Sequence, residues 1–585
     1  MRTWHDPEAF VRETGFRDPE VDQLIRNRIS RRALLRSTAL GGGLAAFLAA
    51  CGGGDSGGEA GSGDSAPIAA QPRQQEGTQP KRGGQAVVAQ ISPHDDIDPH
   101  VTLTASFHAV AFNLCNTLVY VDNDFNFLPG LAESWTIEDE AKTYTFKLRQ
   151  DVAFHDGTPF NAQAMAFNYD RMVDPDTKSR GAKSYLGTYD RAEAIDDYTL
   201  RVHFKEPYPA FLIRSTRGYL VPMSPKAVQA GGNDGVNRRP ITTGPFKMAK
   251  DWNGPGTEIE LVRNEDYRWA PSIYRNNGPA WLERIIYREI RELTTRLSAL
   301  ESGELDVIHE PGEPNLERLN QSDRFLVVQA QRNGSSQGSQ LNFEAGPASD
   351  IAVRKAMLYQ VDRDSMLKAA YFGVHPPAYG PFSPALYAYD PAVESMYPRD
   401  PKKAEQLLEE AGWKKGSDGI RAKGGQRLKL IDTFVNTPTN YPPLHEFLQA
   451  QMKEIGIEIE LRVLDQQAVQ VAGQRRDGDM FALGIRNNDP DVMRTVYHSE
   501  AYGVRFIPGK DPKVDELLDR GAALPNGEER IQVYKDFQRY VMEQAYSLPI
   551  LAPKTTYAAT AKIKNMPGID SNGEYLWAYM DAYKE

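Results

Sequence analysis

Cysteine is nearly absent from the sequence, and so are the motifs that would identify an enzyme. Only Cys51 and Cys115 occur among 585 residues. No H-E-x-x-H zinc motif, P-loop or dinucleotide fingerprint is found. A basic surplus is also missing, because the formal net charge is −11 and the pI is about 5.6. Phosphate binding needs a basic surface, so this balance argues against nucleic acid as a partner.

A membrane-spanning segment is missing from the first eighty residues as well. The apolar run between Arg36 and Cys51 is shorter than the ~20 residues that cross a bilayer. It also contains three consecutive glycines, which weaken a helix. A basic flank, a short apolar core and a small-residue end are typical of an export signal. We therefore predict that residues 1–50 form a signal peptide.

Both ends of this signal carry a known pattern. L-A-A-C at 48–51 resembles the bacterial lipobox, whose cysteine is acylated with diacylglycerol and becomes the new N-terminus. Cys51 is therefore the predicted lipid anchor, which places the protein on the outer face of the cytoplasmic membrane. Arg31 and Arg32 resemble the twin-arginine export motif, with an ordinary secretory signal as the alternative. With Cys51 acylated, Cys115 cannot form an intrachain disulfide and is interpreted as a buried small hydrophobe.

After the signal, the sequence predicts a tether followed by a mixed α/β protein. Residues 51–82 are rich in Gly, Ser, Pro and Gln and are predicted to be flexible. Alternating apolar residues predict a strand at 142–149, and helical spacing predicts a helix after Asn161, which would cap it. A further helix is predicted from Pro401 to a stop at Gly412.

Three motifs suggest chemistry, but their context favours a structural role. G-D-S-G-G at 54–58 lies in the tether, which cannot position a histidine. G-S-S-Q-G at 334–338 would make Ser336 the nucleophile of a hydrolase, but a strand follows it where a helix is needed, so we predict a turn between strands. One group of possible metal ligands has the spacing of neither a helical pair nor a calcium loop: His94, Asp95, Asp96, Asp98 and His100. We predict no catalytic residue, metal or cofactor.

A series of segments resembles one protein family over the whole region after the tether. The longest is L-A-E-S-W-T-I-E-D-E at the start of 131–172, and T-T-G-P-F-K-M, A-L-E-S-G-E-L-D-V-I and Q-M-K-E-I-G-I-E-I-E follow in the family's order. They are similar to family 5 of the bacterial extracellular solute-binding proteins, the dipeptide- and oligopeptide-binding group of ABC importers. The resemblance implies a monomeric receptor, not an enzyme, that delivers solute to a permease driven by a separate ATPase. A sensor or adhesin without a transporter is the alternative.

The resemblance also implies the fold. It would be an α/β fold, the two-lobed clamp of type II periplasmic binding proteins with an extra domain. The parts would be lobe I at 83–119, 243–340 and 553–585, the extra domain at 120–242 and lobe II at 341–552. Leu341, Asn342 and Phe343 would act as a hinge that closes the lobes on solute.

The solute is an oligopeptide by the same resemblance, with an opine, a sugar or a metal chelate as alternatives. Members that prefer dipeptides hold the ammonium with an Asp and the carboxylate with an Arg. Here Arg486 or Asn487 stands at the first position and Thr437 at the second, so both anchors are replaced.

Three charged positions of the loop at 484–493 have two interpretations each. Arg486 would face an anion or be a solvated loop cation. Asp489 and Asp491 would contact the ammonium or cap the next helix. By family position, the candidate contacts are Ser106, Phe107, His108, Asn436, Arg486, Asn487, Asn488, Asp489, Asp491 and Tyr497.

Overall fold

The computed structural model describes residues 80–585 except 103, 105, 123, 438–441 and 501–508. All described residues belong to one compact unit. Arg31, Arg32, Cys51 and nearly all of the predicted tether lie outside the described residues. Among the helices within the described ranges, none has the length and apolar character to cross a bilayer.

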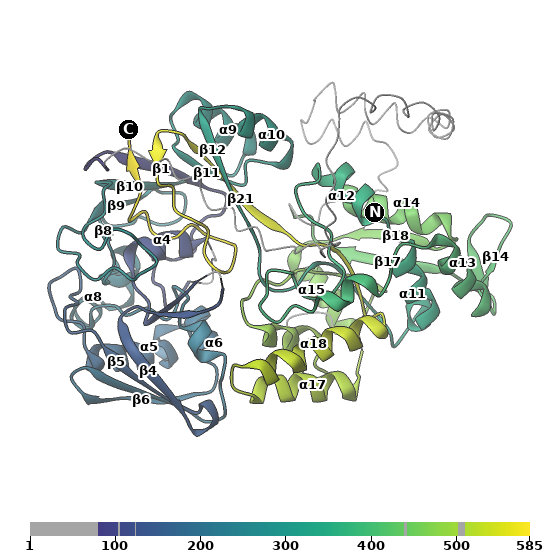
Figure 1. Cartoon of the computed structure of the whole chain (residues 1–585), viewed down its shortest axis with the longest axis horizontal. Coiled ribbons are helices and arrows are strands. Elements are labelled where there is room, and N and C mark those ends of the chain that lie inside the picture. The colour runs from purple at the N-terminus through teal and green to yellow at the C-terminus, as the bar shows by residue number, and fades with distance from the viewer. Residues whose placement is uncertain (1–79, 103, 105, 123, 438–441, 501–508) are drawn as a thin grey trace, which may run out of the picture. The chain divides into compact units, whose positions relative to one another are not determined.

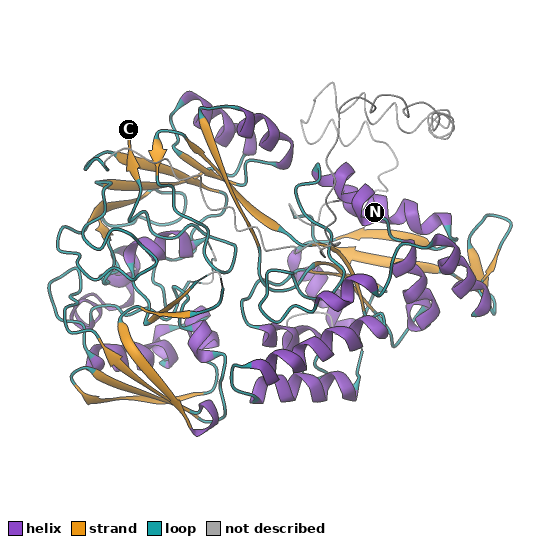
Figure 2. Cartoon of the chain, viewed as in Figure 1, coloured by secondary structure: helices purple, strands orange, loops and turns teal. Residues whose placement is uncertain are grey.

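A seven-stranded mixed sheet is built around the first strand, β1 (Figures 1 and 2). β1 pairs in parallel with β10 and β11, and the remaining pairs are antiparallel. Ala86 and Val88 of β1 join the largest core cluster, whereas Val87 and Ala89 pack with α9 (Leu293–Ser302) and α10 (Glu313–Gln321), so both faces are covered. In sheet order the strands are β12 (Phe325–Gln331), β21 (Lys554–Thr560), β11 (Val307–His309), β1 (Gln85–Gln90), β10 (Arg284–Glu289), β9 (Ile259–Arg263) and β8 (Phe246–Met248).

A four-stranded antiparallel sheet is formed by residues that lie between β1 and β8 in the sequence. It shares a hydrophobic core with the seven-stranded sheet. Tyr144 and Phe146 of β5 are buried in the same cluster as Ala86 and Val88. Asn161 caps the helix beside this sheet by accepting from the Ala164 N–H at 2.9 Å, which confirms the predicted cap. The elements are β4 (Ala132–Glu138), β5 (Thr143–Leu148), β7 (Thr199–Phe204), β6 (Tyr189–Asp196) and α5 (Ala162–Val173), with α4 (Phe107–Leu114), α6 (Gly181–Leu186) and α8 (Pro225–Arg238) nearby in sequence.

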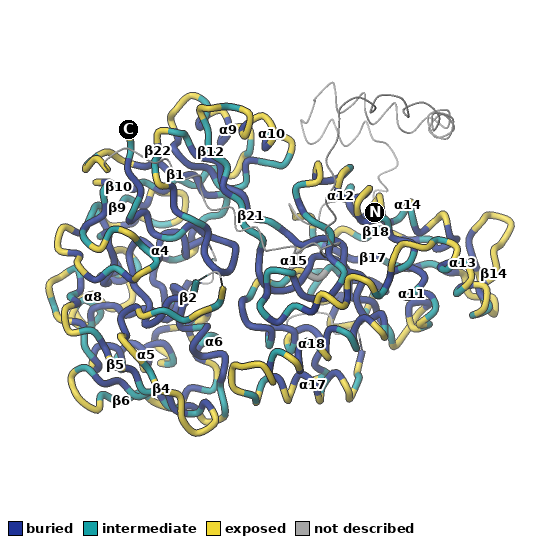
Figure 3. Tube along the Cα trace, in the orientation of Figure 1, coloured by how far each residue is buried: buried dark blue, intermediate teal, exposed yellow. Residues whose placement is uncertain are grey.

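A five-stranded sheet with its own core forms the other half of the described chain. Figure 3 shows that its central strands are buried, and helices α11 to α14 pack against it. The helix predicted from Pro401 is present as α13 and begins at that residue. The sheet order is β18 (Glu458–Val463), β17 (Lys429–Phe434), β19 (Met480–Leu483), β13 (Gln337–Leu341) and β20 (Ser547–Leu551); the helices are α11 (Ile351–Gln360), α12 (Arg363–Tyr371), α13 (Pro401–Glu410), α14 (Pro442–Glu454), α15 (Gln466–Arg475), α17 (Pro512–Ala523) and α18 (Glu528–Glu543).

The chain passes between the two large sheets at 332–336 and at 552–553. β12 and β21 belong to the seven-stranded sheet, whereas β13 and β20 belong to the five-stranded one. We call 332–336 the first crossing. Gly334 to Ser336 of the segment G-S-S-Q-G therefore do lie between strands, whereas its last two residues begin β13; the segment links two sheets and is not a turn within one. The predicted hinge residues lie at the other end of β13, where Asn342 donates its N–H to the Asp479 carbonyl at 2.8 Å.

Candidate functional site

The loop after β19 carries Arg486 and is fastened to the first crossing. The Ser335 N–H donates to the Ile485 carbonyl at 2.8 Å, and the Ile485 N–H donates to Ser335 Oγ at 2.7 Å. Gly334 has φ of +104°, and a Cβ there would lie 2.1 Å from the Ile485 carbonyl oxygen. Only glycine allows this approach, because any side chain would collide with the loop backbone. The G-S-S-Q-G segment thus positions Arg486 rather than supplying a nucleophile.

The other end of the same loop is fixed by a buried ion pair. The two carboxylate oxygens of Asp489 accept from Arg530 at 2.8 and 3.0 Å, and both side chains are about 1% exposed. Asp489 also accepts from the Asp491 N–H at 2.8 Å and so caps the short helix Pro490–Met493. Burial opposes ionisation, but Arg530 outweighs it and lowers the pKa of Asp489. The capping interpretation of Asp489 is confirmed.

A second loop, close to the C-terminus, presents Glu574 to Arg486. The Asn333 N–H of the first crossing donates to the Asn572 carbonyl at 2.9 Å. Gly573 has φ of +68°, and its Cα lies so close to the crossing that a Cβ would be 2.1 Å from the Gln331 carbonyl oxygen. The first crossing therefore fastens both loops, through Asn333 on one side and through Gly334 and Ser335 on the other.

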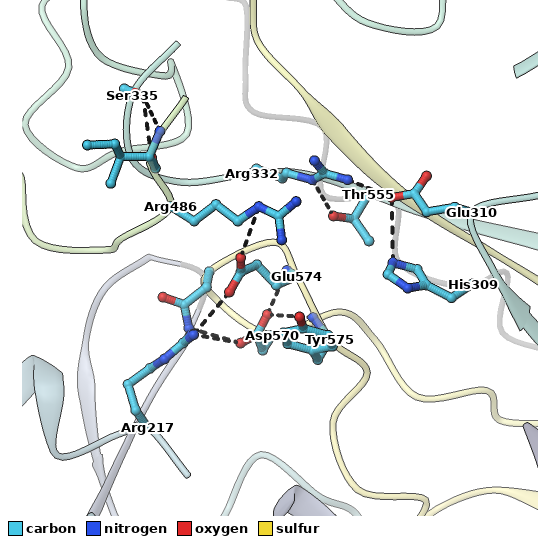
Figure 4. Close-up of polar contacts among 12 residues, drawn as sticks. Arg217, His309, Glu310, Arg332, Ser335, Arg486, Thr555, Asp570, Glu574 and Tyr575 are labelled. Carbon is cyan, nitrogen blue, oxygen red and sulfur yellow. Dashed lines mark hydrogen bonds and ion pairs between the residues drawn. The ribbon is translucent and has the colours of Figure 1, made fainter. Parts of the chain in front are cut away.

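Glu574 is shared between two arginines (Figure 4). Its Oε2 accepts from Arg217 Nη2 at 3.0 Å, and its Oε1 lies 3.3 Å from Arg486 Nε. Glu574 and Arg217 are buried, whereas the Arg486 side chain is 49% exposed. Burial opposes ionisation of Glu574, but Arg486 and Arg217 outweigh it and hold its pKa below the usual value. Asp570, 3.5 Å from Arg217, has a raised pKa chiefly because it is buried.

Arg332 of the first crossing extends this charged cluster. It donates through Nε to Thr555 Oγ1 at 2.8 Å and through Nη2 to Glu310 at 2.5 Å. Burial opposes ionisation of Glu310, but Arg332 and His309 lower its pKa to about 2. The three arginines and three carboxylates of this region, which we call the charged cluster, are Arg217, Arg332, Arg486, Glu310, Asp570 and Glu574 (Figure 4).

A small pocket lies beside the charged cluster, at the start of α4. Its cavity volume is about 10 Å³, which is room for a water molecule, and its lining includes Gln90, Ser106, His309, Tyr557, Tyr575 and Tyr579. Within the described part of the chain, Gln90 Oε1 and Ser106 Oγ have no hydrogen-bond partner. His108 lies under Tyr219 with ring centroids 4.4 Å apart, and burial lowers the pKa of its imidazole well below 6.5.

The structure places the sequence-predicted residues in three settings. Arg486 belongs to the charged cluster. Ser106 lines the small pocket, and His108 lies near Arg217 of the charged cluster. Asn487, Asn488, Asp489 and Asp491 belong to the same loop or the turn after it, and Asp491 accepts from Tyr534 OH at 3.1 Å. The others lie elsewhere: Phe107 is completely buried in the core, Tyr497 packs against Phe537, and Asn436 is exposed after β17.

Residues of the suspected chemical motifs are used structurally. Ser336 is buried and its Oγ donates to the Gly380 carbonyl at 2.6 Å. Asp98 and His100 both contact Arg171, at 2.6 and 2.8 Å. No group of three metal-ligating side chains is found within the described ranges. Sequence reasoning missed Glu574 and Arg217, which reach Arg486 only through long-range contacts.

The chain is similar to known binding proteins over most of its length. A family model described as bacterial extracellular solute-binding proteins, family 5 Middle, matches residues 126–503. The glutathione-binding protein GsiB of Pectobacterium atrosepticum is 26% identical over 511 residues, which cover 85% of this chain and 93% of GsiB.

Two solved structures share the fold. The periplasmic binding protein DppA from Helicobacter pylori, in complex with peptide STSA, is 25% identical with a TM-score of 0.67 and covers 86% of this chain and 99% of its own. NikA from Brucella suis, in complex with Fe(III)-EDTA, is 24% identical with a TM-score of 0.74 and covers 86% and 100%.

Proposed function

The chain belongs to family 5 of the bacterial extracellular solute-binding proteins, and on this premise we propose that it binds short peptides and delivers them to the permease of an ABC importer. The predicted family and fold class, the α/β clamp of type II binding proteins, are confirmed. Proteins of this family bind small solutes outside the cytoplasm and work with ABC permease and ATPase subunits.

The choice of a peptide rests on the charged cluster. A peptide carries charges of both signs and a polar backbone, and the cluster offers arginines and carboxylates side by side next to a pocket with unpaired polar groups. The single observation that carries the proposal is the 3.3 Å contact between Arg486 and Glu574, because it leaves a half-exposed guanidinium beside a buried carboxylate. Two of the compared proteins are named for glutathione or hold a peptide, which supports the same class.

The cellular setting follows from the signal region. We propose that Arg31 and Arg32 direct export and that Cys51 carries the lipid, so that a monomeric receptor stays at the outer face of the membrane. Lobe I would comprise 83–119, 243–336 and 553–585, with the extra domain at 120–242 and lobe II at 337–552. The boundary expected at 340 moves to the first crossing because β13 (Gln337–Leu341) pairs with β19 and β20. We place the moving joints at the two crossings rather than at Leu341, Asn342 and Phe343. Cys51→Ser would abolish labelling by a palmitate analogue if the anchor is correct.

A thermal-shift panel on the mature protein tests the solute class. It compares tri-alanine, glutathione, a nickel–histidine complex, an opine and an oligosaccharide. A ligand present at about 100 times its Kd adds about 2.7 kcal/mol to the free energy of unfolding. We expect this stabilisation from at least one peptide. Stabilisation by the chelate, opine or sugar without any by a peptide would overturn the peptide assignment and leave the receptor role in place.

A further inference from the structure

We infer that Arg486 binds a carboxylate of the solute, and that Glu574 and Arg217 hold its guanidinium ready for that contact. This inference rests on the proposed receptor function and specifies its ligand.

The contacts of Arg486 leave its donor face open. Its ion pair with Glu574 is made through Nε, and neither terminal nitrogen has a partner among the described residues. A guanidinium presents parallel N–H groups that match the two oxygens of a carboxylate. A side chain that is 49% exposed is accessible to solute, whereas Arg217 and Arg332 in the same cluster are buried in ion pairs. Arg217 Nε and Nη1 have no hydrogen-bond partner among the described residues, but burial keeps them from solute.

An ordinary solvated loop cation would not be held in this way. The loop backbone is bonded to Ser335 on both sides of Ile485, and Gly334 lies so close to the loop that a Cβ on it would be 3.0 Å from Arg486 Cα. Glu574 in turn is held by Arg217 and by the fixed C-terminal loop. Because both partners are fastened to the first crossing, the guanidinium is oriented before solute arrives, which reduces the entropy lost on binding.

The balance of charge favours a carboxylate over a more highly charged anion. Three arginines face three acidic side chains in the charged cluster, so one added monoanion leaves a small excess of negative charge. A dianionic phosphate would meet stronger repulsion from Glu574, Asp570 and Glu310. We therefore assign the solute to amino-acid-derived molecules with a free carboxylate at the end that meets Arg486.

Isothermal titration with matched acid and amide peptides tests the assignment. The mature protein is titrated with tri-alanine and with tri-alanine amide, which differ only in the C-terminal charge. We expect the acid to bind on the order of 30-fold more tightly, the loss typical of removing one partner of a hydrogen-bonded charge pair. Arg486→Gln should remove this discrimination, and Arg486→Lys should retain part of it because it keeps the charge without the paired donors.

Two further variants separate positioning from general damage. Arg427→Gln is the matched control, because Arg427 is 48% exposed, pairs with carboxylates and lies on the hairpin strand Gln426–Arg427. It should leave the acid-to-amide ratio unchanged. Glu574→Gln keeps the shape of the positioning residue but not its charge, and should lower the ratio. It should also lower the melting temperature, because the buried Arg217 is left with only Asp570 at 3.5 Å, so the ratio measured on folded protein is the readout.

The outcomes distinguish the inference from the receptor proposal. Equal binding of acid and amide by the wild-type protein, or an unchanged ratio in Arg486→Gln, overturns the inference and leaves peptide binding intact. If neither form of tri-alanine binds, the Arg486 variants are titrated with the solute found in the thermal-shift panel, and the peptide assignment fails only if glutathione does not bind either. A carboxylate-bearing solute that requires Arg486 supports the inference, and a solute without a carboxylate overturns it.

Discussion

Arg486 and Asp489 lie three positions apart on one loop, yet their ion pairs have opposite designs. Asp489 and Arg530 are both about 1% exposed and exchange two hydrogen bonds. Arg486 is 49% exposed and meets Glu574 through a single nitrogen. A closed pair has no capacity left for a solute, whereas a half-open pair has donors to spare. The difference indicates that one end of the loop serves stability and the other serves binding.

The largest loss of stability is expected at the buried ion pair between Asp489 and Arg530. Asp489→Asn would leave the Arg530 guanidinium buried without a counter-charge, and should lower the free energy of unfolding by about 3–5 kcal/mol. Chemical denaturation followed by circular dichroism measures this. Asp418→Asn is the control, because Asp418 is 50% exposed in its pair with Arg427, and it should cost much less stability than Asp489→Asn. Equal losses in the two variants would remove the structural half of the comparison.

The fastening of the loop is tested at Gly334. Gly334→Ala places a Cβ 2.1 Å from the Ile485 carbonyl oxygen at a φ of +104°. Gly254→Ala imposes a similar φ, +100°, where no atom lies within 4 Å. We expect Gly334→Ala to cost about 3 kcal/mol and Gly254→Ala about 1–2 kcal/mol. Gly334→Ala should also weaken peptide binding, and a variant that binds normally would show that the loop needs no such support.

Acid should lower the free energy of unfolding through a second buried polar group, which is centred on His100. The imidazole accepts from Arg171 at 2.8 Å and donates to the Val221 carbonyl at 2.9 Å. Burial is the main cause that lowers its pKa from 6.5 to about 4. The folded state therefore binds fewer protons than the unfolded state in this range, and stability is lost as pH falls from about 6.5 to 4.

The magnitude of that loss is up to about 3 kcal/mol for this one group. Denaturation at pH 7, 6, 5 and 4 measures it against His100→Asn, which does not titrate. The wild-type stability should fall more steeply than that of the variant, although His94 and His155, whose pKa values burial also lowers to about 4, add a slope common to both. Parallel slopes would contradict the assignment.

The smallest effect on stability is expected at the binding end of the loop. Arg486→Gln removes a half-exposed charge and leaves Glu574 still paired with Arg217. The free energy of unfolding should change by less than about 1 kcal/mol. A loss as large as that of Asp489→Asn would mean that both ends of the loop are structural, and the comparison would fail.

Local pattern predicts the elements well, and long-range pairing explains what it misses. The cap at Asn161, the helix from Pro401 and the strand at 143–148 follow from side chains within a few residues of each other. The strands around G-S-S-Q-G also follow from local pattern, but their separation into two sheets depends on pairing with β19, β20 and β21, which no local pattern encodes.

The same limit applies to the site. Arg486 can be found from the sequence because its loop aligns with the family. The sequence does not decide whether Arg486 faces an anion or is a solvated loop cation. Glu574 and Arg217 favour the anion-binding interpretation, but they come from distant segments and belong to no sequence motif. Phe107 and Tyr497 follow from family position alone, and the core packing that buries them depends on residues far along the chain.

The most direct test of the account is a crystal structure of the mature protein with a bound peptide. We predict that a carboxylate of the peptide lies about 3 Å from the terminal nitrogens of Arg486, while Arg486 Nε keeps its contact with Glu574 and Asp489 keeps its pair with Arg530. A peptide whose carboxylates all lie away from Arg486, with that side chain in solvent, would contradict the division of the loop into a stabilising end and a binding end.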